Sequence, residues 1–461
     1  MFAQKEKMKE VKAIILSCFA MVSAVAQEGY SADLVSLSDR PCPQWWKDAK
    51  FGIFVHWGVY SVPAFAPTSG DKFYSCYAEH YKGRLLSGDD AFVKYHEKMF
   101  PGLSYDDLAA RFTAENWKPD DWAELFRRAG AKYVVLTSKH HEGFPLWPSV
   151  DSPRWNSTVV GPKRDICGEL TKAVKAAGLH MGLYYSLFEY KHPLCGEKAT
   201  ARFVEEVNIP QLKDIVTRYS PEIVWADGHW RIPKEVARSD EFLSWLYSES
   251  PVRETVVVND RWWDGARGRS GDFYTTEYDH SGEDGDEKKD HPWEECRGIG
   301  RSFGYNRFER AENYLTDAQC IETLCDKVSR GGNLLLNVGP DATGLIPPIM
   351  EERLLAIGRW LAANGEAIYG TTAWKGRPKD MKKDRVYYTD KPDALYVIAF
   401  NWPQEALRVP GCGMVSKVSL LGSDVSVVFV QDGDDLVITP PTINPGTVPC
   451  EHAWTFKLAR K

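Results

Sequence analysis

The stretch IPQLKDIVTRYSPEIVWADG, residues 209–228, decides the fold because it holds one helix and one strand in direct succession. The helix carries apolar side chains at the spacing of a single face, at Leu212, Ile215, Val216 and Tyr219. The apolar run that follows, residues 223–226, is typical of a strand buried on both faces, and Asp227 and Gly228 come directly after it. Repetition of such a unit predicts a parallel sheet covered by helices.

The same alternation extends over most of the chain. The strand candidates are residues 51–58, 132–141, 180–186, 222–228, 255–260, 272–278, 302–306 and 333–340. Eight buried strands with amphipathic helices between them favour a (β/α)8 TIM-like barrel over an open doubly wound sheet. The helices near the fifth to seventh strands are poorly marked in the sequence.

The pattern changes after residue 370. Short alternating runs such as ALYVIAFNW and DLVITP are separated by Asp-Gly and proline-rich turns, which predicts an antiparallel β-sandwich. We therefore expect an α/β barrel domain over residues 27–370 and a C-terminal β-sandwich domain over residues 371–461.

Residues 1–26 have the pattern of a cleavable secretory signal. Four lysines precede an apolar stretch that ends in Ala24-Val25-Ala26, and this stretch is too short to span a membrane. We expect a secreted or periplasmic protein without membrane insertion, although Cys18 leaves a lipoprotein as the alternative. Removal of this segment takes the formal charge from −7 to −9, because it removes four lysines and two glutamates, and this charge argues against nucleic acid as a partner. The sequence does not predict the oligomeric state.

The cysteines do not form a recognisable framework. Nine remain after residue 26, and they lie apart without any C-x-x-C pair, so neither disulfides nor a zinc ribbon are expected. No cofactor is expected either.

Polar side chains end six of the predicted strands, where a barrel carries its active site. They are His56, His140, His141, Tyr184, Asp227, Asn259, Arg261 and Glu277. Residues two apart on a strand face the same side, so Phe54 accompanies His56 and Trp225 accompanies Asp227. A pocket with an apolar corner and several polar edges suits a deoxysugar.

Asp227 and Glu277 are the candidate catalytic pair. Glycosidases that retain configuration use two carboxyl groups about 5–5.5 Å apart, one as nucleophile and one as acid/base. An apolar wall raises the pKa of a carboxyl group and a neighbouring arginine such as Arg261 lowers it, so the two acids can take different roles.

Six blocks of the chain resemble the retaining α-L-fucosidases of glycoside hydrolase family 29 over about residues 40–375. They are FGIFVHWGVYSVPAF, AGAKYVVLTSKHHEGFPLW, GPKRDICGEL, IPQLKDIVTRYSPEIVWADG, VVVNDRW and GGNLLLNVGPDATG. The resemblance implies that Asp227 is the nucleophile and Glu277 the acid/base. It further implies hydrogen bonds to the fucose hydroxyls from His56, Glu79, His140, His141 and Arg261, and a wall around the fucose methyl group made of Phe54, Tyr184, Trp225 and Phe303. The implied substrate is a fucosylated oligosaccharide or a glycoprotein glycan.

One position differs from the family pattern, and the identity of the acid/base leaves a second candidate open. The chain reads YAEHY where the family has tryptophan after the glutamate, so His80 replaces a side chain that borders the sugar. Glu294 in HPWEEC is the alternative acid/base.

Two other functions compete with this interpretation. The adjacent histidines with Asp227 and Glu79 could bind a metal in a barrel hydrolase, but the spacings H-x-H and H-E-x-x-H are absent, and we expect no metal. A carbohydrate-binding protein without activity would keep the aromatic residues but would not need the two acids.

Overall fold

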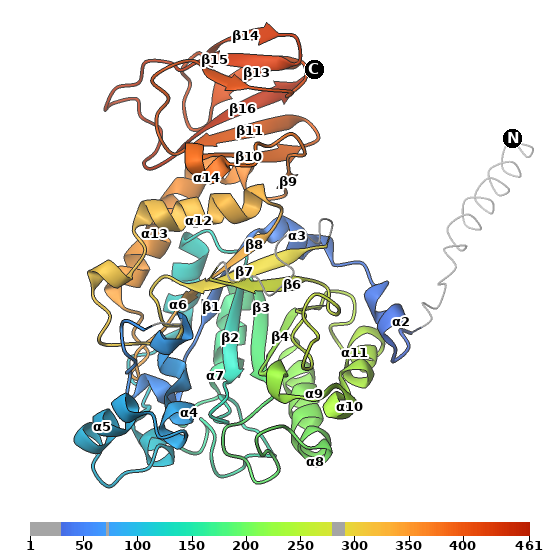
Figure 1. Cartoon of the computed structure of the whole chain (residues 1–461), viewed down its shortest axis with the longest axis vertical. Helices are drawn as coiled ribbons and strands as arrows, with labels where there is room; N and C mark the ends of the chain where they lie inside the picture. Colours follow the sequence, from blue (N-terminus) through green and yellow to red (C-terminus); the bar gives the residue numbers. More distant parts are fainter. Residues whose placement is uncertain (1–28, 71–72, 279–290) are drawn as a thin grey trace, which may run out of the picture.

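The structure is a computed structural model that describes residues 29–70, 73–278 and 291–461. The predicted signal segment, residues 1–26, lies outside the described residues. Figure 1 shows a barrel of strands wrapped by helices, and a C-terminal β region in orange and red on one side of it.

The barrel is one sheet of eight strands in the order β5-β4-β3-β2-β1-β8-β7-β6, and each neighbouring pair in this order is parallel. The strands are β1 (Phe51–Val55), β2 (Tyr133–Lys139), β3 (His180–Ser186), β4 (Ile223–Asp227), β5 (Val257–Val258), β6 (Tyr274–Glu277), β7 (Trp293–Gly298) and β8 (Asn333–Val338). Between β5 and β6, the amides of Asp272 and Phe273 donate to the Val258 carbonyl at 2.9 and 3.3 Å. The predicted TIM-like barrel is thus confirmed.

Helices cover the outside of the sheet. The α-helices are α2 (Leu34–Ser38), α3 (Gln44–Ala49), α4 (Tyr81–Leu86), α5 (Asp90–Met99), α6 (Pro119–Arg128), α7 (Ile166–Ala176), α8 (Ala201–Phe203), α9 (Ile209–Tyr219), α10 (Lys234–Ala237), α11 (Ser239–Ser248), α12 (Asp317–Ser329), α13 (Pro348–Asn364) and α14 (Met381–Asp384). The shorter helical turns are η1 (Val59–Ser61), η2 (Phe73–Cys76), η3 (Ala78–His80), η4 (Asp106–Arg111), η5 (Val204–Asn208), η6 (His229–Arg231), η7 (Ala311–Asn313) and η8 (Gly365–Ala367). Residues 259–273, which join β5 to β6, contain turns but no helix, and this explains the weak helical pattern in that region.

The predicted seventh strand is wrong. Residues 302–306 form a loop, and the strand at this place is β7, which lies earlier in the chain. The run WEEC in β7 does not look apolar, yet Glu294 and Glu295 are both buried. Each is hydrogen-bonded inside the protein, Glu294 to Tyr133 and Trp225 and Glu295 to Thr276. Buried acids whose oxygens are hydrogen-bonded can lie in a buried strand, and a search for apolar runs does not detect such a strand.

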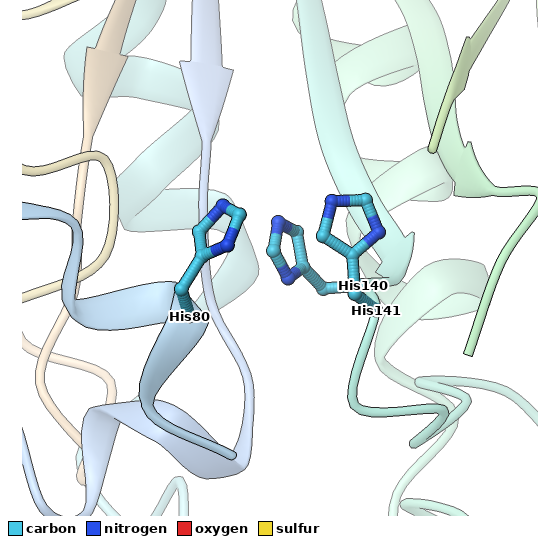
Figure 2. A group of neighbouring side chains, drawn as sticks. All are labelled: His80, His140 and His141. Carbon is cyan, nitrogen blue, oxygen red and sulfur yellow. The ribbon is translucent and has the colours of Figure 1, made fainter. Parts of the chain in front are cut away.

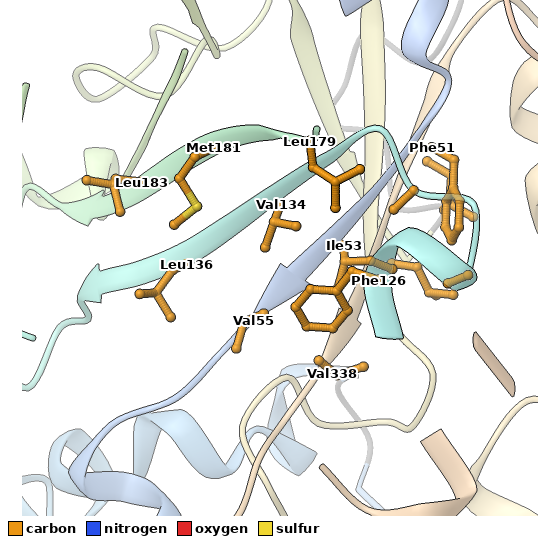
Figure 3. Close-up of a cluster of buried hydrophobic side chains, with 14 of the residues drawn as sticks. Phe51, Ile53, Val55, Phe126, Val134, Leu136, Leu179, Met181, Leu183 and Val338 are labelled. Atoms are coloured by element: carbon orange, nitrogen blue, oxygen red, sulfur yellow. The ribbon is translucent and has the colours of Figure 1, made fainter. Parts of the chain in front are cut away.

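Side chains of each strand alternate between the helices and the barrel interior. Figure 3 shows Phe51, Ile53 and Val55 of β1 beside the apolar side chains of β2 and β3, with Phe126 of α6 packed close to them. The intervening residue Gly52 faces Tyr133, and a Cβ at this position would lie 2.2 Å from the Tyr133 ring. Glycine at 52 therefore lets the Tyr133 ring cross the interior towards Glu294.

The C-terminal region consists of two antiparallel sheets, in agreement with the predicted sandwich. One sheet has the order β13-β16-β11-β10-β9 and the other the order β12-β15-β14. Their strands are β9 (Thr372–Ala373), β10 (Val386–Lys391), β11 (Ala394–Ala399), β12 (Leu407–Val409), β13 (Val415–Leu420), β14 (Val428–Asp432), β15 (Asp435–Thr439) and β16 (Trp454–Arg460). The indole of Trp360 on α13 donates to the Ala453 carbonyl at 2.9 Å, and Arg385 pairs with Glu322 on α12, so barrel helices anchor this region.

Two further expectations concern cysteines and membranes. The nine cysteines within the described ranges are all unpaired. Among the described helices, none combines the length and the apolar character needed to cross a bilayer.

Candidate active site

A cavity of about 600 Å³ opens at the carboxyl ends of the barrel strands. Nearly all of the predicted site residues line it: Phe54, His56, Glu79, His140, Tyr184, Trp225, Asp227, Arg261, Glu277 and Phe303. His141 is not among the lining residues, but its Nε2 lies 3.5 Å from Asp227 Oδ2. The structure thus brings the predicted residues together.

The guanidinium of Arg261 connects the two candidate catalytic acids. Its Nη1 lies 3.2 Å from Asp227 Oδ1 and its Nη2 lies 3.1 Å from Glu277 Oε2. The Nε of the same group donates to Thr275 Oγ1 at 2.9 Å, and this hydroxyl donates to Asp260 at 2.8 Å. With its three nitrogens engaged, the guanidinium has a fixed orientation.

Asp227, the last residue of β4, is held as a carboxylate. Tyr184 donates its hydroxyl to Oδ2 at 2.9 Å, while Arg261 contacts Oδ1. Burial by itself would raise the pKa of Asp227, but its polar surroundings, above all the positive charge of Arg261, outweigh burial, so the pKa lies well below its usual range. Asp227 is therefore ionised at neutral pH.

Glu277, the last residue of β6, is more accessible than Asp227. Its side chain is 20% exposed and that of Asp227 is 11% exposed. Tyr77, which lies just before η3, donates its hydroxyl to Glu277 Oε1 at 2.8 Å. Glu277 thus borders the cavity, and its two oxygens accept hydrogen bonds from Tyr77 and from Arg261.

The histidines around the cavity are neutral. Burial lowers the pKa of His56 to about 3 and that of His141 to about 4, and it lowers the pKa of His140 well below the usual range. Because Asn337 Oδ1 lies 2.7 Å from His56 Nδ1 and can only accept, Nδ1 carries the proton and Nε2 is an acceptor. Neutral imidazoles can donate at one nitrogen and accept at the other, which suits sugar hydroxyls.

Glu79 on η3 is buried in the cavity wall. The Gly304 amide and the Ser302 hydroxyl donate to its Oε2 at 2.8 and 3.3 Å. Burial nevertheless dominates over these hydrogen bonds and raises the pKa of Glu79 from 4.5 to about 8. The protonated acid can donate a hydrogen bond into the cavity at neutral pH.

The four residues of the predicted apolar wall form one aromatic cluster. The centroid of the Phe54 ring lies 5.2 Å from that of Trp225, 5.8 Å from that of Tyr184 and 6.3 Å from that of Phe303. Phe303 reaches this cluster from the loop after β7 and not from a strand, so its predicted position holds although its predicted secondary structure does not.

Comparison with known proteins identifies the family. The Alpha-L-fucosidase family model matches residues 17–366, and the model for the Alpha-L-fucosidase C-terminal domain matches residues 379–459. The tissue alpha-L-fucosidase of Rattus norvegicus is 43% identical over 458 residues, which are 97% of this chain and 96% of that protein. The chain belongs to the alpha-L-fucosidase family.

Two further relatives agree with this assignment to the glycoside hydrolases. The tissue alpha-L-fucosidase of Homo sapiens is 42% identical over 440 residues, which cover 93% of this chain and 91% of that protein. The crystal structure of Thermotoga maritima alpha-fucosidase in complex with a mechanism-based inhibitor is 35% identical, with a TM-score of 0.77 over 94% of this chain and 100% of that chain. The predicted resemblance is thereby confirmed.

Glu294, the alternative acid of this fucosidase-family chain, lies outside the cavity lining. It is the second residue of β7, near the start of the strand, and its side chain is buried in the barrel interior. Its two oxygens accept from Tyr133 at 2.6 Å and Trp225 at 3.0 Å. Burial raises the pKa of Glu294 to about 7. Glu294 is therefore placed to hold the Trp225 indole in position through this hydrogen bond.

The sequence alone missed several residues that line the cavity of this fucosidase-family chain. Tyr77 and Tyr190 contribute to its wall, and His229 Nδ1 lies 4.0 Å from Asp227 Oδ1. Tyr77 lies only two positions before the predicted Glu79, and His229 lies two after Asp227. Proximity in sequence to a predicted residue was the available signal for both.

The raised pKa of Glu79 predicts a pH-dependent loss of stability. As the pH rises from 4.5 to about 8, Glu79 ionises in the unfolded chain but stays protonated in the folded chain. The free energy of unfolding should therefore fall over this range and level off above it. Glu79→Gln removes this contribution, so urea titrations at pH 5 and pH 8 should show a smaller decrease for the variant than for the wild type.

Glu97→Gln provides the matched control, because Glu97 is exposed on α5. Its stability should follow the wild-type pH profile. Parallel profiles for Glu79→Gln and the wild type would show that Glu79 is ionised in the folded protein.

Proposed function

We propose that this protein hydrolyses terminal α-L-fucose from fucosylated oligosaccharides or glycoprotein glycans, with retention of configuration, by a double displacement. The observation that carries the proposal is the pair of carboxyl groups on one guanidinium, at 3.2 Å for Asp227 and 3.1 Å for Glu277. The family assignment and the fucosidase complex with a mechanism-based inhibitor support the activity.

In the first step, Asp227 is the nucleophile. One of its oxygens forms a bond to the anomeric carbon while the bond from this carbon to the leaving oxygen breaks. The low pKa of Asp227 supports this role, because the residue is ionised before the sugar arrives. The Tyr184 hydroxyl and Arg261 each hold one carboxylate oxygen and so fix the direction of attack.

Glu277 is the acid/base. It donates a proton to the leaving oxygen in the first step and accepts one from water in the second, when water displaces Asp227 from the sugar and releases α-L-fucose. The greater exposure of Glu277 suits a group that must meet the leaving group and then water. Glu294 suits this role less well, because both its oxygens are engaged beneath Trp225.

The remaining residues bind the sugar in this proposal. His56, His140, His141, Glu79 and Arg261 hydrogen-bond the hydroxyls, and the aromatic cluster around Phe54 holds the methyl group. A hydroxyl on that methyl carbon would be buried without a partner in this corner, at a cost of about 1–3 kcal/mol. The apolar corner therefore favours a 6-deoxy sugar.

We also propose that the protein is exported, to the periplasm or the outside of the cell. The support is the pattern of residues 1–26, with lysines before an apolar stretch and a small-residue cleavage site.

Removal of the nucleophile tests the proposal directly. Asp227→Ala should lower kcat/KM for an aryl α-L-fucoside by on the order of 10⁴-fold, the scale seen when one member of a catalytic unit is lost. Azide can enter the vacated space and should restore transfer, with a product of inverted configuration. Mass spectrometry and NMR of the azide product check this, and near wild-type hydrolysis by Asp227→Ala would refute the role.

The choice between the two glutamates has its own test. Glu277→Ala should lose about 10²–10⁴-fold in rate on a substrate with a poor leaving group, because general acid catalysis contributes this much. It should lose far less on an aryl fucoside with an acidic phenol, which leaves without a proton. Glu294→Ala is the matched control and should affect both substrates equally; if it shows the leaving-group dependence instead, the assignment of Glu277 is wrong.

A further inference from the structure

Three imidazoles converge at one side of the cavity. Figure 2 shows His80, from η3, opposite the adjacent pair His140 and His141, which follow β2. One nitrogen from each of the three rings can be chosen so that all three lie within 4.8 Å of one another. The centroid of the His80 ring lies 5.7 Å from that of the His140 ring and 5.4 Å from that of the His141 ring.

Two of the rings are held by a hydrogen bond at Nδ1. The Tyr190 hydroxyl lies 2.6 Å from His80 Nδ1, and the Ser186 hydroxyl lies 2.6 Å from His141 Nδ1. When each Nδ1 carries the proton and donates to its hydroxyl oxygen, each Nε2 presents a lone pair. Histidines that bind metals are typically oriented by such a second hydrogen bond.

Two nitrogens of the group lack a hydrogen-bond partner within the described chain. They are His140 Nδ1 and His141 Nε2, and both are fully buried. An imidazole nitrogen with a free lone pair is the atom that binds a metal ion, and these two buried nitrogens are candidates for it.

We propose that His80, His140 and His141 form a binding site for a borderline divalent transition metal ion, Zn²⁺ or Cu²⁺. Imidazole suits these ions, whereas Mg²⁺ and Ca²⁺ need oxygen ligands. Three nitrogens at about 2.1 Å from one Zn²⁺ lie about 3.4 Å apart, so the rings must approach by a little over 1 Å. The site is therefore formed by small side-chain rotations.

The surrounding charges act in both directions. Asp227 Oδ2 lies 3.5 Å from His141 Nε2 and favours a cation at the group, whereas Arg261, on the far side of Asp227, opposes it. The Asp227 carboxylate can serve as an oxygen ligand.

His80 makes this site a property of this chain. The family pattern has tryptophan at this position, and tryptophan has no lone pair for a metal. Without His80 only the neighbouring pair of histidines remains.

A metal ion at this group would exclude the sugar. His80 and His140 line the same cavity as Asp227 and Glu277, and a bound ion would occupy the nitrogens that are proposed to bind hydroxyls. This second part of the inference rests on the proposed function, and it predicts that the metal inhibits in competition with fucose.

Calorimetric titration of the chelator-treated full chain with ZnCl₂ at pH 7 tests the site itself. The wild type should bind one ion. His80→Trp should bind at least about tenfold more weakly, since even loss of a residue that only orients a ligand costs 10–100-fold in metal affinity. His180→Gln is the control and should bind like the wild type, because His180 lies at the start of β3, at the opposite end of the barrel, where it pairs with Glu222.

Electron paramagnetic resonance of the wild type with one equivalent of Cu²⁺ gives a readout that needs no variant. Coupling to three imidazole nitrogens is the expected spectrum. Absence of stoichiometric binding, or equal affinity of His80→Trp and the wild type, would overturn the metal site.

The competition is tested separately by adding L-fucose to the titration and by inhibition of aryl α-L-fucoside hydrolysis. Fucose should weaken Zn²⁺ binding, and Zn²⁺ should raise KM with little change in kcat. Simultaneous binding of both would overturn the competition and leave the metal site in place. Since the titration does not depend on turnover, failure of the proposed activity would be seen as absent hydrolysis with unchanged metal binding.

Discussion

The guanidinium of Arg261 holds two carboxyl groups in one pocket, and the chemistry of the site depends on this contact. Asp227 and Glu277 come from two strands, β4 and β6, that are not neighbours in the sheet. Without the cation between them, the two carboxylates would repel each other. Loss of one partner of a buried ion pair typically costs about 3–5 kcal/mol. The arginine therefore permits an ionised Asp227 next to a second carboxyl group.

Burial elsewhere in the pocket has the opposite effect on charge. The histidines become neutral, and burial raises the pKa of Glu79 to about 8. A neutral wall can hydrogen-bond hydroxyl groups without attracting counterions, and it leaves the negative charge at Asp227. Desolvation and one well-placed cation thus account for most of the electrostatics of the site.

The strand ends could be predicted from the sequence because they follow from the two-residue period of buried strands. Phe54 with His56, and Trp225 with Asp227, fall on the interior face as the period requires. The seventh strand could not be predicted in this way, because Glu294 and Glu295 are paired with residues distant in the chain, and only the fold reveals the partners. Tyr77 and Tyr190 belong to loops, whose course depends on tertiary packing. The convergence of His80 with His140 and His141 likewise joins segments 60 residues apart.

The central claim is that two acids on one arginine perform a double displacement, and the configuration of the first product tests it most directly. Proton NMR of the wild-type enzyme during the first moments of aryl α-L-fucoside hydrolysis would distinguish the two anomers of fucose before they equilibrate in water. The account predicts that α-L-fucose appears first and that the β anomer grows later by mutarotation. Initial formation of β-L-fucose would mean a single displacement by water and would contradict the role of Asp227 as nucleophile.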